Sequence, residues 1–539
     1  MSDQVFGIDL GTTYSAIAFI NDFGQSEVIR NREGEETTPS VVFFENATNF
    51  VVGKEAKNEI LLNPDTTVAL IKRHMGTDFS LDFFGQPFRP ETISALILRD
   101  LVDYAKENSG IDTNKVVVTV PAYFGLTEKE ATRQAGEIAG LEVVGIVTEP
   151  VAAALSVGIT GEQTKTLFVY DLGGGTFDCT IMQLSPGTVE VVVIDGNRLL
   201  GGADWDAKLF ELLNARFMTQ AGLIDDPTAD EDFAQKLMTL VEETKKTLSR
   251  KDRASVTLSY GDALEKVEVT RAEFEEATRT LVDETLEIVK RTVASAQAKR
   301  PGLELDEVLL VGGSSRMPMI EASLENEMGW KLHKTELDLA VAKGAAIYGQ
   351  GALQFQETTE NGSVPAVGAA ASDPVEDKKL LIGGSTVAVR NVLSRSLGVQ
   401  FVRRNASFTD GWEPYIGFLA HANDSLPNDW TVEGATAGDG ATEITIHIFE
   451  QASGIEDESP ASNREVTPGD GATLRNLPRL AAGSPIHFDL HIDAEGKATL
   501  SAFEPTTNQH IEMAVSLSVM QQAEVDAAKG QVSGMIRRD

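Results

Sequence analysis

The first two thirds of the chain alternate short β-type runs with longer helix-type runs. Residues 116–121, VVVTVP, form a continuous apolar run that predicts a buried strand, and residues 126–141 have the spacing of a helix. Residues 232–249 carry apolar side chains at helical intervals. Alternation of this kind continues to about Gly351 and predicts an α/β domain.

The pattern changes beyond residue 355. Residues 356–377 are small, polar and acidic without periodicity, which favours a flexible linker. Residues 443–451 then largely alternate apolar and polar positions, and residues 486–504 read as two strands around a turn. The sequence therefore predicts an α/β domain at 1–354, a linker at 355–384, an antiparallel β domain at 385–518, and a short C-terminal helix or tail at 519–539.

Length and charge narrow the classes of function. A chain of 539 residues is too long for one core, so two or three domains are expected. The net charge of −36 repels nucleic acid and anionic membranes, so neither is an expected partner. The chain has no apolar run of membrane-spanning length, and its first residues lack the pattern of a secretory signal. Together with a single cysteine, Cys179, these features predict a cytoplasmic protein.

Two similar segments suggest a duplicated architecture with a binding cleft between its halves. FGIDLGTTYSAIAF at residues 6–19 and FVYDLGGGTFDCTI at residues 168–181 both read strand, Asp-Leu-Gly, small residues and strand. Glycines at the tip of a hairpin let backbone N–H groups approach an anion such as phosphate. The acids before the tips, Asp9 and Asp171, suit Mg²⁺, which favours one or two carboxylates plus phosphate oxygens.

The alternative interpretation is that each glycine run is only a tight turn. The shared acid at the same offset favours the binding site, and we expect the hydroxyls of Thr12, Thr13 and Thr176 to face phosphate or water.

A third glycine motif and one helix face suggest a nucleoside. LLVGGSSRMPMI at residues 309–320 places two glycines between a strand and a helix start, with Arg316 available to stack on a purine. Glu242, Lys245 and Ser249 share one face of the predicted helix at 232–249, which suits a ribose. A solvated charged face is the alternative interpretation of that spacing.

Six ordered motifs resemble the ATPase domain of the seventy-kilodalton heat-shock chaperones of the DnaK type. They are GIDLGTTYSAIA, VVVTVPAYF, VTEPVAAALSVG, YDLGGGTFD, LLGGADWD and LLVGGSSRMP. The resemblance covers residues 4 to about 351 and continues more weakly into the β region, while IKRHMGTDF resembles bacterial, Gram-positive-type members. It implies an α/β actin-like ATPase domain of two lobes around an ATP cleft, a linker, and an antiparallel β-sandwich that binds extended peptides.

Position by position, the resemblance implies a magnesium-dependent ATP site. Lys72 matches the lysine that positions the attacking water, and Glu149, Thr176, Asp9 and Asp171 match the other catalytic groups. Without the resemblance, Lys72 would be interpreted as a surface lysine and Glu149 as a helix N-terminal acid. Asp9, Asp171 and Asp178 also match residues near the family's potassium ions. The positions that match nucleotide-binding residues are Gly11, Thr12, Thr13, Tyr14, Gly173, Gly174, Gly175, Gly201, Gly202, Glu242, Lys245, Ser249, Gly312, Gly313, Ser314, Arg316 and Asp338.

Several positions depart from the family pattern. The helical lid over the peptide cleft is missing, and the family's hydrophobic linker aligns with TVAVRNV at 386–392, where Asn391 replaces an acid, or with a displaced equivalent at 378–384. The other departures are Val144 and Gly145 in place of basic residues that engage J-domain partners, Ala203 in place of an acid, and a hairpin shorter than the bacterial exchange-factor loop. These differences argue against the usual contacts with J-domain and exchange-factor partners more strongly than they argue against ATP binding.

Two functions follow from these motifs. The first is a chaperone that hydrolyses ATP slowly and binds extended apolar segments of unfolded proteins weakly, since no lid slows their release. Its cleft would use Phe418, Ile444 and Ile446, although Gly434 stands where the family has a bulky apolar residue. The second is an ATP-binding regulatory or scaffold relative. A sugar kinase or a filament protein would share the fold, but the appended β domain argues against both.

A possible metal set in the β region has a simpler interpretation. His487, Asp489, His491 and Asp493 alternate with apolar residues along one predicted strand. Such alternation indicates the solvated face of a half-buried strand rather than a metal site.

Overall fold

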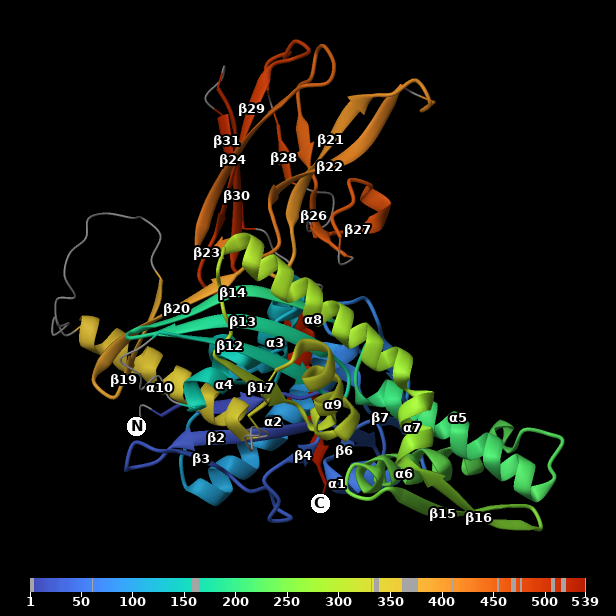
Figure 1. Cartoon of the computed structure of the whole chain (residues 1–539). Helices are drawn as coiled ribbons and strands as arrows, with labels where there is room; N and C mark the ends of the chain where they lie inside the picture. Colours follow the sequence, from blue (N-terminus) through green and yellow to red (C-terminus); the bar gives the residue numbers. More distant parts are fainter. Residues whose placement is uncertain are drawn as a thin grey trace.

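A computed structural model describes residues 4–60, 62–157, 164–330, 332–333, 339–360, 377–409, 411–452, 455–466, 472–475, 477–505, 509–514 and 520–538. Figure 1 shows a broad α/β body with a β domain standing on one side of it. Within the described residues, no helix combines the length and the apolar character that crossing a membrane requires.

The first α/β unit, residues 4–157, is built on one mixed sheet. Strand β1 (Phe6–Asp9) lies between the antiparallel β2 (Tyr14–Ile20) and the parallel β10 (Lys115–Val120). The apolar run of β10 is buried over nearly its whole length, as expected for a parallel strand covered on both faces. The order is β11-β10-β1-β2-β3, with β4 paired to β2. The other elements are β3 (Ser26–Val28), β4 (Thr38–Pro39), β5 (Val42–Phe44), β6 (Asn49–Val52), β7 (Thr67–Val68), β8 (Leu81–Phe83), β9 (Gln86–Phe88), β11 (Glu142–Thr148), α1 (Lys54–Glu59), α2 (Pro90–Ser109), α3 (Leu126–Ile138) and α4 (Glu149–Val157).

The second unit, residues 164–333, repeats this arrangement. Strand β12 (Lys165–Leu172) lies between the antiparallel β13 (Phe177–Ser185) and the parallel β17 (Glu307–Val311). Its sheet contains the order β18-β17-β12-β13-β14, which matches the first sheet strand for strand. The duplication predicted from the two glycine segments is therefore present in the topology. The other elements are β14 (Thr188–Asn197), β15 (Arg253–Tyr260), β16 (Ala263–Thr270), β18 (Leu332–His333), α5 (Gly202–Ala221), α6 (Glu231–Leu248), α7 (Arg271–Ala277), α8 (Arg279–Lys299) and α9 (Pro318–Met328).

Helices cover the two sheets with apolar stripes. In α6 the stripe buries Phe233, Leu237 and Val241, as the spacing predicts, and the Asp230 side chain caps the helix by accepting the Phe233 N–H at 3.1 Å. Helix α10 (Ala340–Glu360) packs on β1 and β2 and against α4.

The β domain contains two four-stranded antiparallel sheets that pack face to face, and a two-stranded sheet formed by β25 and β28. The orders of the four-stranded sheets are β22-β21-β26-β27 and β24-β29-β30-β31, and side chains from both, such as Val399 and Leu490, share one buried cluster. The predicted turn after residue 492 is present, because the Asp493 side chain accepts the N–H groups of Glu495 and Lys497 at 2.9 and 2.8 Å. The strands are β21 (Leu397–Arg404), β22 (Trp412–Ala420), β24 (Asn428–Ala435), β25 (Ile444–Ile446), β26 (Ile448–Gln451), β27 (Asn463–Glu465), β28 (Ala472–Leu474), β29 (Pro485–Ile492), β30 (Ala498–Glu504) and β31 (Gln509–Ala514).

The segment between the α/β body and the β domain differs from the predicted linker. Helix α10 continues to Glu360, and β19 (Lys378–Ile382) and β20 (Ser385–Val392) form an antiparallel hairpin. Strand β20 also pairs in parallel with β14, and β23 (Ser425–Leu426) pairs with β20. Residues 378–392 therefore extend the sheet of the second unit. The side chains of Val387, Val389 and Val392 are buried in the core of the α/β body, which favours this position for the strand.

The C-terminal residues fold back on the first unit. Helix α11 (Gln522–Gly534) packs on α2 and α3, and β32 (Ile536–Arg537) pairs in parallel with β6. Figure 1 shows this segment, in red, ending at the body far from the β domain. The predicted short helix is present, and a strand that the sequence pattern did not indicate follows it.

Candidate functional site

The two predicted phosphate hairpins face each other between the α/β units. The first is the turn between β1 and β2, and the second is the turn between β12 and β13. A Cβ placed on Gly174 would lie 2.3 Å from Thr13 Cγ2, and one on Gly175 would lie 2.5 Å from Thr12 Cγ2. These positions need glycine because any side chain would collide with the opposite hairpin.

The start of α5 completes the second hairpin. The N–H groups of Gly202 and Ala203 donate to the carbonyl oxygens of Gly173 and Gly174, each at 2.9 Å. A Cβ on Gly201 would lie 2.5 Å from the backbone of Gly175. The predicted Gly201 and Gly202 therefore belong to the same backbone cradle, which faces the positive end of a helix dipole.

Four carboxylates gather beside the hairpins: those of Asp9, Asp171, Asp178 and Glu149. Burial, and then the charge of Glu149, raises the pKa of Asp9 to about 7 and that of Asp178 to about 7. Burial and the neighbouring acids raise the pKa of Asp171 well above its usual range. The Thr119 hydroxyl donates to Asp9 at 3.0 Å, which fixes one of these carboxylates in place.

This donor set fits a hydrated divalent cation. Carboxylate oxygens are the protein ligands that Mg²⁺ prefers, and a cation here would offset the repulsion between the acids. Among the described residues, no three acidic, histidine or cysteine side chains lie close enough together to hold a metal by themselves. Asp9 and Asp171 would therefore act together with water and phosphate oxygens, and the bound ion would supply neutralisation of phosphate charge.

Lys72 reaches this cluster from the 3-10 helix Ile71–His74. Its Nζ donates to Glu149 Oε1 at 2.8 Å and lies 5.7 Å from the centre of the Phe124 ring. The side chain is only 4 % exposed, so Lys72 is not the surface lysine that its residue type alone suggests. Glu149 is the first residue of α4, so the expectation of a helix N-terminal acid is also met.

Arg73 was missed by the sequence analysis. Its Nε donates to the Gly175 carbonyl oxygen at 3.1 Å, and its Nη2 donates to Asp204 Oδ2 at 3.0 Å. The guanidinium group thus joins the first unit to the second hairpin and to α5. The sequence held no local signal for it, because adjacent residues of a 3-10 turn point in different directions and Arg73 does not share the partner of Lys72.

A comparison with protein-family models matches residues 5–85 and 80–360 to the family described as Hsp70 protein. The matched part holds both hairpins, the four carboxylates and Lys72. The chain belongs to the Hsp70 family. Members of this family are ATP-binding chaperones and ATPases that bind ATP or ADP with Mg²⁺. The resemblance seen in the six sequence motifs is therefore confirmed.

The predicted nucleoside residues of this Hsp70 lie around the third glycine motif. Lys245 Nζ donates to the Gly202 carbonyl oxygen at 2.9 Å and to Asp206 Oδ2 at 2.8 Å. A Cβ on Gly202 would lie 2.2 Å from Ser314 Oγ, and Gly312 adopts a φ of +81° with its Cβ position 2.6 Å from Asp171 Oδ1. The motif therefore adjoins both the cradle and the acids.

Three further predictions have separate outcomes. Gly313 and Arg316 are exposed beside this motif. The Ser249 hydroxyl donates to the Lys245 carbonyl oxygen at 3.0 Å and so caps the end of α6. Asp338 lies outside the described residues.

Glu242 connects the two units of the Hsp70 rather than pointing freely to a ribose. It accepts hydrogen bonds from Lys57 Nζ at 2.7 Å and from the Tyr14 hydroxyl at 3.2 Å, and Lys246 Nζ lies 2.9 Å away. Although burial opposes the shift, hydrogen bonds from Lys57 and Lys246 lower the pKa of Glu242 to about 2. We call the contact of Tyr14, Lys57 and Glu242 the cross-unit bridge.

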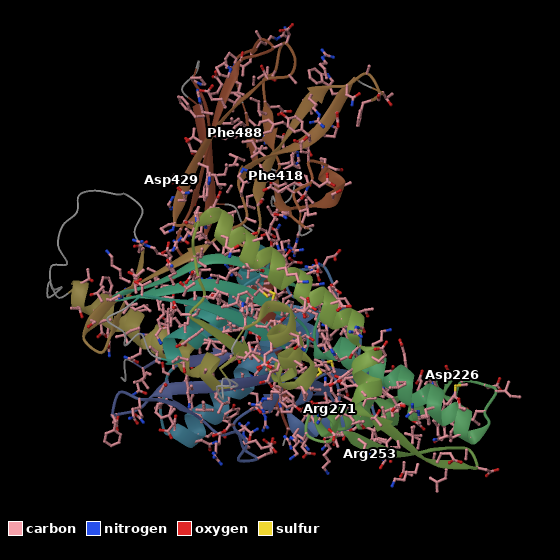
Figure 2. The ribbon with its side chains drawn as sticks, viewed as in Figure 1. Asp226, Arg253, Arg271, Phe418, Asp429 and Phe488 are labelled. Atoms are coloured by element: carbon pink, nitrogen blue, oxygen red, sulfur yellow. The ribbon has the colours of Figure 1, made fainter. Side chains whose placement is uncertain are left out.

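The β domain places the predicted peptide-cleft residues apart. Ile446 lies in the domain core and Ile444 packs against it. Phe418 pairs with Gly398 while Phe401 pairs with Tyr415, so Phe418 and Phe401 lie on opposite faces of the β21–β22 ribbon. Figure 2 marks Phe418 on this ribbon and Phe488 on the neighbouring sheet.

Phe401 occupies the space beside Gly434. A Cβ on Gly434 would lie 2.8 Å from Phe401 Cε1, and one on Gly417 would lie 2.8 Å from Phe401 Cδ2. The Phe401 ring meets the Phe488 ring edge-on at 5.8 Å between centroids. The bulky group that Gly434 lacks is therefore replaced by a ring from the neighbouring sheet.

The apparent metal set is spread along one strand. His491 Nδ1 lies 2.7 Å from Asp429 Oδ1, and the Asp489 carboxylate accepts the Thr431 hydroxyl at 2.6 Å. These polar side chains alternate along β29 with the buried Phe488 and Leu490.

Proposed function

We propose that this Hsp70 is a slow Mg²⁺-dependent ATPase of the DnaK type that acts as a cytoplasmic chaperone. In this proposal the two α/β units are the lobes of an actin-like ATPase domain, and the nucleotide binds between them. Mg²⁺ and K⁺ would bind beside the carboxylates of Asp9, Asp171 and Asp178. The backbone of the second hairpin would bind the phosphates. Lys72, Glu149 and Thr176 would position the attacking water.

One observation carries the proposal: Lys72 and the carboxylates meet beside two facing glycine hairpins. Phosphoryl transfer needs positioned charges around the γ-phosphate and the attacking water, with little covalent chemistry from the protein. A buried cation, carboxylates for a metal and a backbone cradle provide these parts in one place.

Single-turnover hydrolysis tests the proposal directly. ATP would be bound first, Mg²⁺ added in K⁺ or Na⁺ buffer, and ADP measured with time. We expect turnover slower than about 1 s⁻¹, faster in K⁺, and greatly reduced in Asp171→Asn. The control is Asp112→Asn, because Asp112 is 96 % exposed and pairs at 3.3 Å with Lys106 of α2, which is not a site residue. ATP binding without Mg²⁺-dependent ADP formation would reject the enzymatic part.

A second candidate function is an ATP-binding regulator or scaffold without a full chaperone cycle. The observation that favours it is the Phe401 ring, which lies beside Gly434, the position where the resemblance leads us to expect a bulky apolar residue. The two functions differ in their response to an extended apolar peptide. A chaperone predicts peptide-stimulated ATPase activity, whereas a regulator predicts none. We further propose that stimulation by J-domain proteins is weak, because Val144 and Gly145 offer them no cation.

A further inference from the structure

The C-terminal residues Met520–Arg538, here named the clasp, are part of the core of the first α/β unit. Val525, Ala528 and Val532 lie on one face of α11 and are at most 6 % exposed. With Met520 and Met535 they join the hydrophobic cluster that holds the side chains of the first unit's own strands and helices. The clasp is therefore integrated into the unit rather than resting on its surface.

Polar contacts hold both ends of α11. Gln134 Nε2 donates to the Met520 carbonyl oxygen at 3.1 Å, which ties down the segment before the helix. At the other end, Arg99 donates to the carbonyl oxygens of Val532 and Met535, the latter at 2.9 Å. The Val532 carbonyl also accepts the Met535 N–H at 3.2 Å, so Arg99 adds a second hydrogen bond there and provides a donor for the Met535 carbonyl just beyond the helix.

The last residues extend a sheet of the first unit. Strand β32 pairs in parallel with β6, and the N–H groups of Ile536 and Arg538 donate to the carbonyl oxygens of Thr48 and Phe50, each at 2.8 Å. Arg537 forms an ion pair with the buried Asp100, which Arg32 also contacts at 2.7 Å. The strand thus has both backbone and side-chain attachments.

The β domain has independent attachments to the α/β body at its other end. Strand β20, which leads into the domain, pairs with β14 of the second unit. Arg395 Nη1 lies 3.0 Å from Glu128 Oε1 of α3 and 3.6 Å from Glu450 Oε2 of β26. The β domain is therefore joined to the second unit through β20, to the first unit through Arg395 and Glu128, and to the first unit again after its last strand.

The chain between β31 and the clasp is short. Ala514 ends β31, and six residue steps lead to Met520. A chain of this length spans about 20 Å at full extension. As long as the clasp stays in place, the last strand of the β domain cannot move further than this from the first unit.

We propose that the clasp is an intramolecular tether that keeps the β domain docked on the α/β body in both the ADP-bound and the ATP-bound protein. Nucleotide exchange then changes the α/β body without releasing the β domain. This inference goes beyond the proposed ATPase activity, and a distance between the domains tests it without any hydrolysis.

Two labels measure that distance. Asp112→Cys in the first unit and Asp429→Cys on β24 place reactive thiols at exposed positions, while the native Cys179 is buried and stays unlabelled. Figure 2 shows Asp429 on the β domain. Distance distributions from paired spin labels would be recorded with ADP, with ATP and without nucleotide.

The variants separate the clasp from its surroundings. Ala528→Asp places a carboxylate in the apolar contact between α11 and the first unit, where Ala528 is 6 % exposed, while the matched Lys529→Asp places the same acid on the exposed face of α11. A chain that ends at Val519 removes the clasp entirely. Thermal unfolding identifies any variant that fails to fold, and Ala528→Asp decides alone if the shortened chain does so.

We expect one short distance in all three conditions for the labelled parent and for Lys529→Asp. Ala528→Asp or the shortened chain should add a longer-distance population with at least one nucleotide. The inference is overturned if the labelled parent already changes distance between ADP and ATP. It is equally overturned if every folded variant keeps the single short distance.

Discussion

Lys72 Nζ and Glu149 Oε1 lie 2.8 Å apart in a buried ion pair that joins positions 77 residues apart in the chain. Lys72 comes from a 3-10 turn and Glu149 from the first residue of α4. The pair lies beside Asp9 and Asp171, so the positive charge of one lysine acts on several carboxylates. Lys72 therefore offsets part of the negative charge that these buried carboxylates place at the site.

Lys72→Ala should reduce single-turnover ATP hydrolysis by about 100-fold or more, because removing a positioned donor affects the transition state more than the bound state. Nucleotide affinity should change by no more than a few-fold. Quench-flow and a fluorescent-nucleotide titration measure the two quantities. Glu149→Gln is the matched variant, since it keeps shape while removing the partner charge. A rate equal to that of the parent would remove Lys72 from the reaction.

The cross-unit bridge should slow the release of nucleotide. Lys57→Met removes the 2.7 Å contact with Glu242, so the two units separate more readily and dissociation of ADP should accelerate about 2- to 10-fold. Stopped-flow displacement of a fluorescent ADP measures this rate. Lys54→Met is the control, because Lys54 lies on the same helix and pairs with Glu35 at 3.0 Å within the first unit. Equal acceleration in both variants would assign the effect to general loss of charge.

Arg395 should contribute strongly to stability because it compensates two buried carboxylates. Its side chain is 4 % exposed, and those of Glu128 and Glu450 are 2 % and 1 % exposed. Arg395→Met removes the 3.6 Å ion pair of the buried Glu450 and leaves Glu128 with only Arg198 at 3.3 Å and Arg464 at 3.9 Å, so it should lower the free energy of unfolding by about 3–5 kcal/mol. Urea denaturation measures this change.

Two further variants test whether the effect of Arg395→Met comes from buried charge. Arg403→Met removes exposed ion pairs with Glu413 and Glu458 and should cost less than about 1 kcal/mol. Adding Glu450→Gln to Arg395→Met should restore part of the lost stability, because one of the two buried charges is gone. Absence of any restoration would place the cost in packing rather than charge.

The local hairpin pattern predicted the two facing hairpins, since glycines and acids at fixed offsets reflect contacts that form within a few residues. Asp9 and Asp171 could be placed opposite each other because both segments repeat one pattern. Arg73 could not be assigned in the same way. Its partners, Gly175 and Asp204, belong to the other unit and lie far along the chain. A contact between such distant positions leaves no local spacing pattern in the sequence.

The connections between domains could not be predicted from the sequence for a related reason. The alternation at residues 386–392 shows that β20 is a strand but not which sheet it joins, and β14 lies nearly 200 positions earlier. The face of α11 is formed by Val525, Ala528 and Val532 among polar residues, so its pattern indicates only a short helix. Arg99, which holds the end of α11, lies more than 430 positions away.

Phe401→Ala should open an apolar space between the two sheets of the β domain. Loss of the ring next to Gly417 and Gly434 should destabilise the domain by about 2–4 kcal/mol. If extended peptides bind beside Gly434, affinity for a labelled apolar peptide should rise at least several-fold above the parent, for which we expect micromolar or weaker binding, about −8 kcal/mol. Fluorescence anisotropy measures both proteins. Phe418→Ala is the control on the opposite face, and equal affinities in all three would argue against a pocket there.

Lys129 should make stability rise with pH in the alkaline range. It lies on α3 at the contact with the β domain, where it faces Glu450, Glu128, Arg395 and Asp493, and burial lowers its pKa to about 8. Between that value and the ordinary pKa of about 10.4, the unfolded chain binds a proton that the native protein does not bind. The free energy of unfolding should therefore increase from pH 8 to pH 10, by up to about 1 kcal/mol per pH unit.

Urea denaturation at several pH values, compared with Lys129→Met, isolates this effect. Methionine at this position has no proton to lose, so the free energy of unfolding of Lys129→Met should rise less steeply with pH. The free energy of unfolding of the parent minus that of the variant should therefore increase with pH. Lys497→Met is the control, because Lys497 is exposed on the neighbouring turn and should leave the slope unchanged. Parallel curves for the parent and Lys129→Met would mean that Lys129 stays protonated in the native protein and that its contact with Glu450 and Glu128 outweighs its burial.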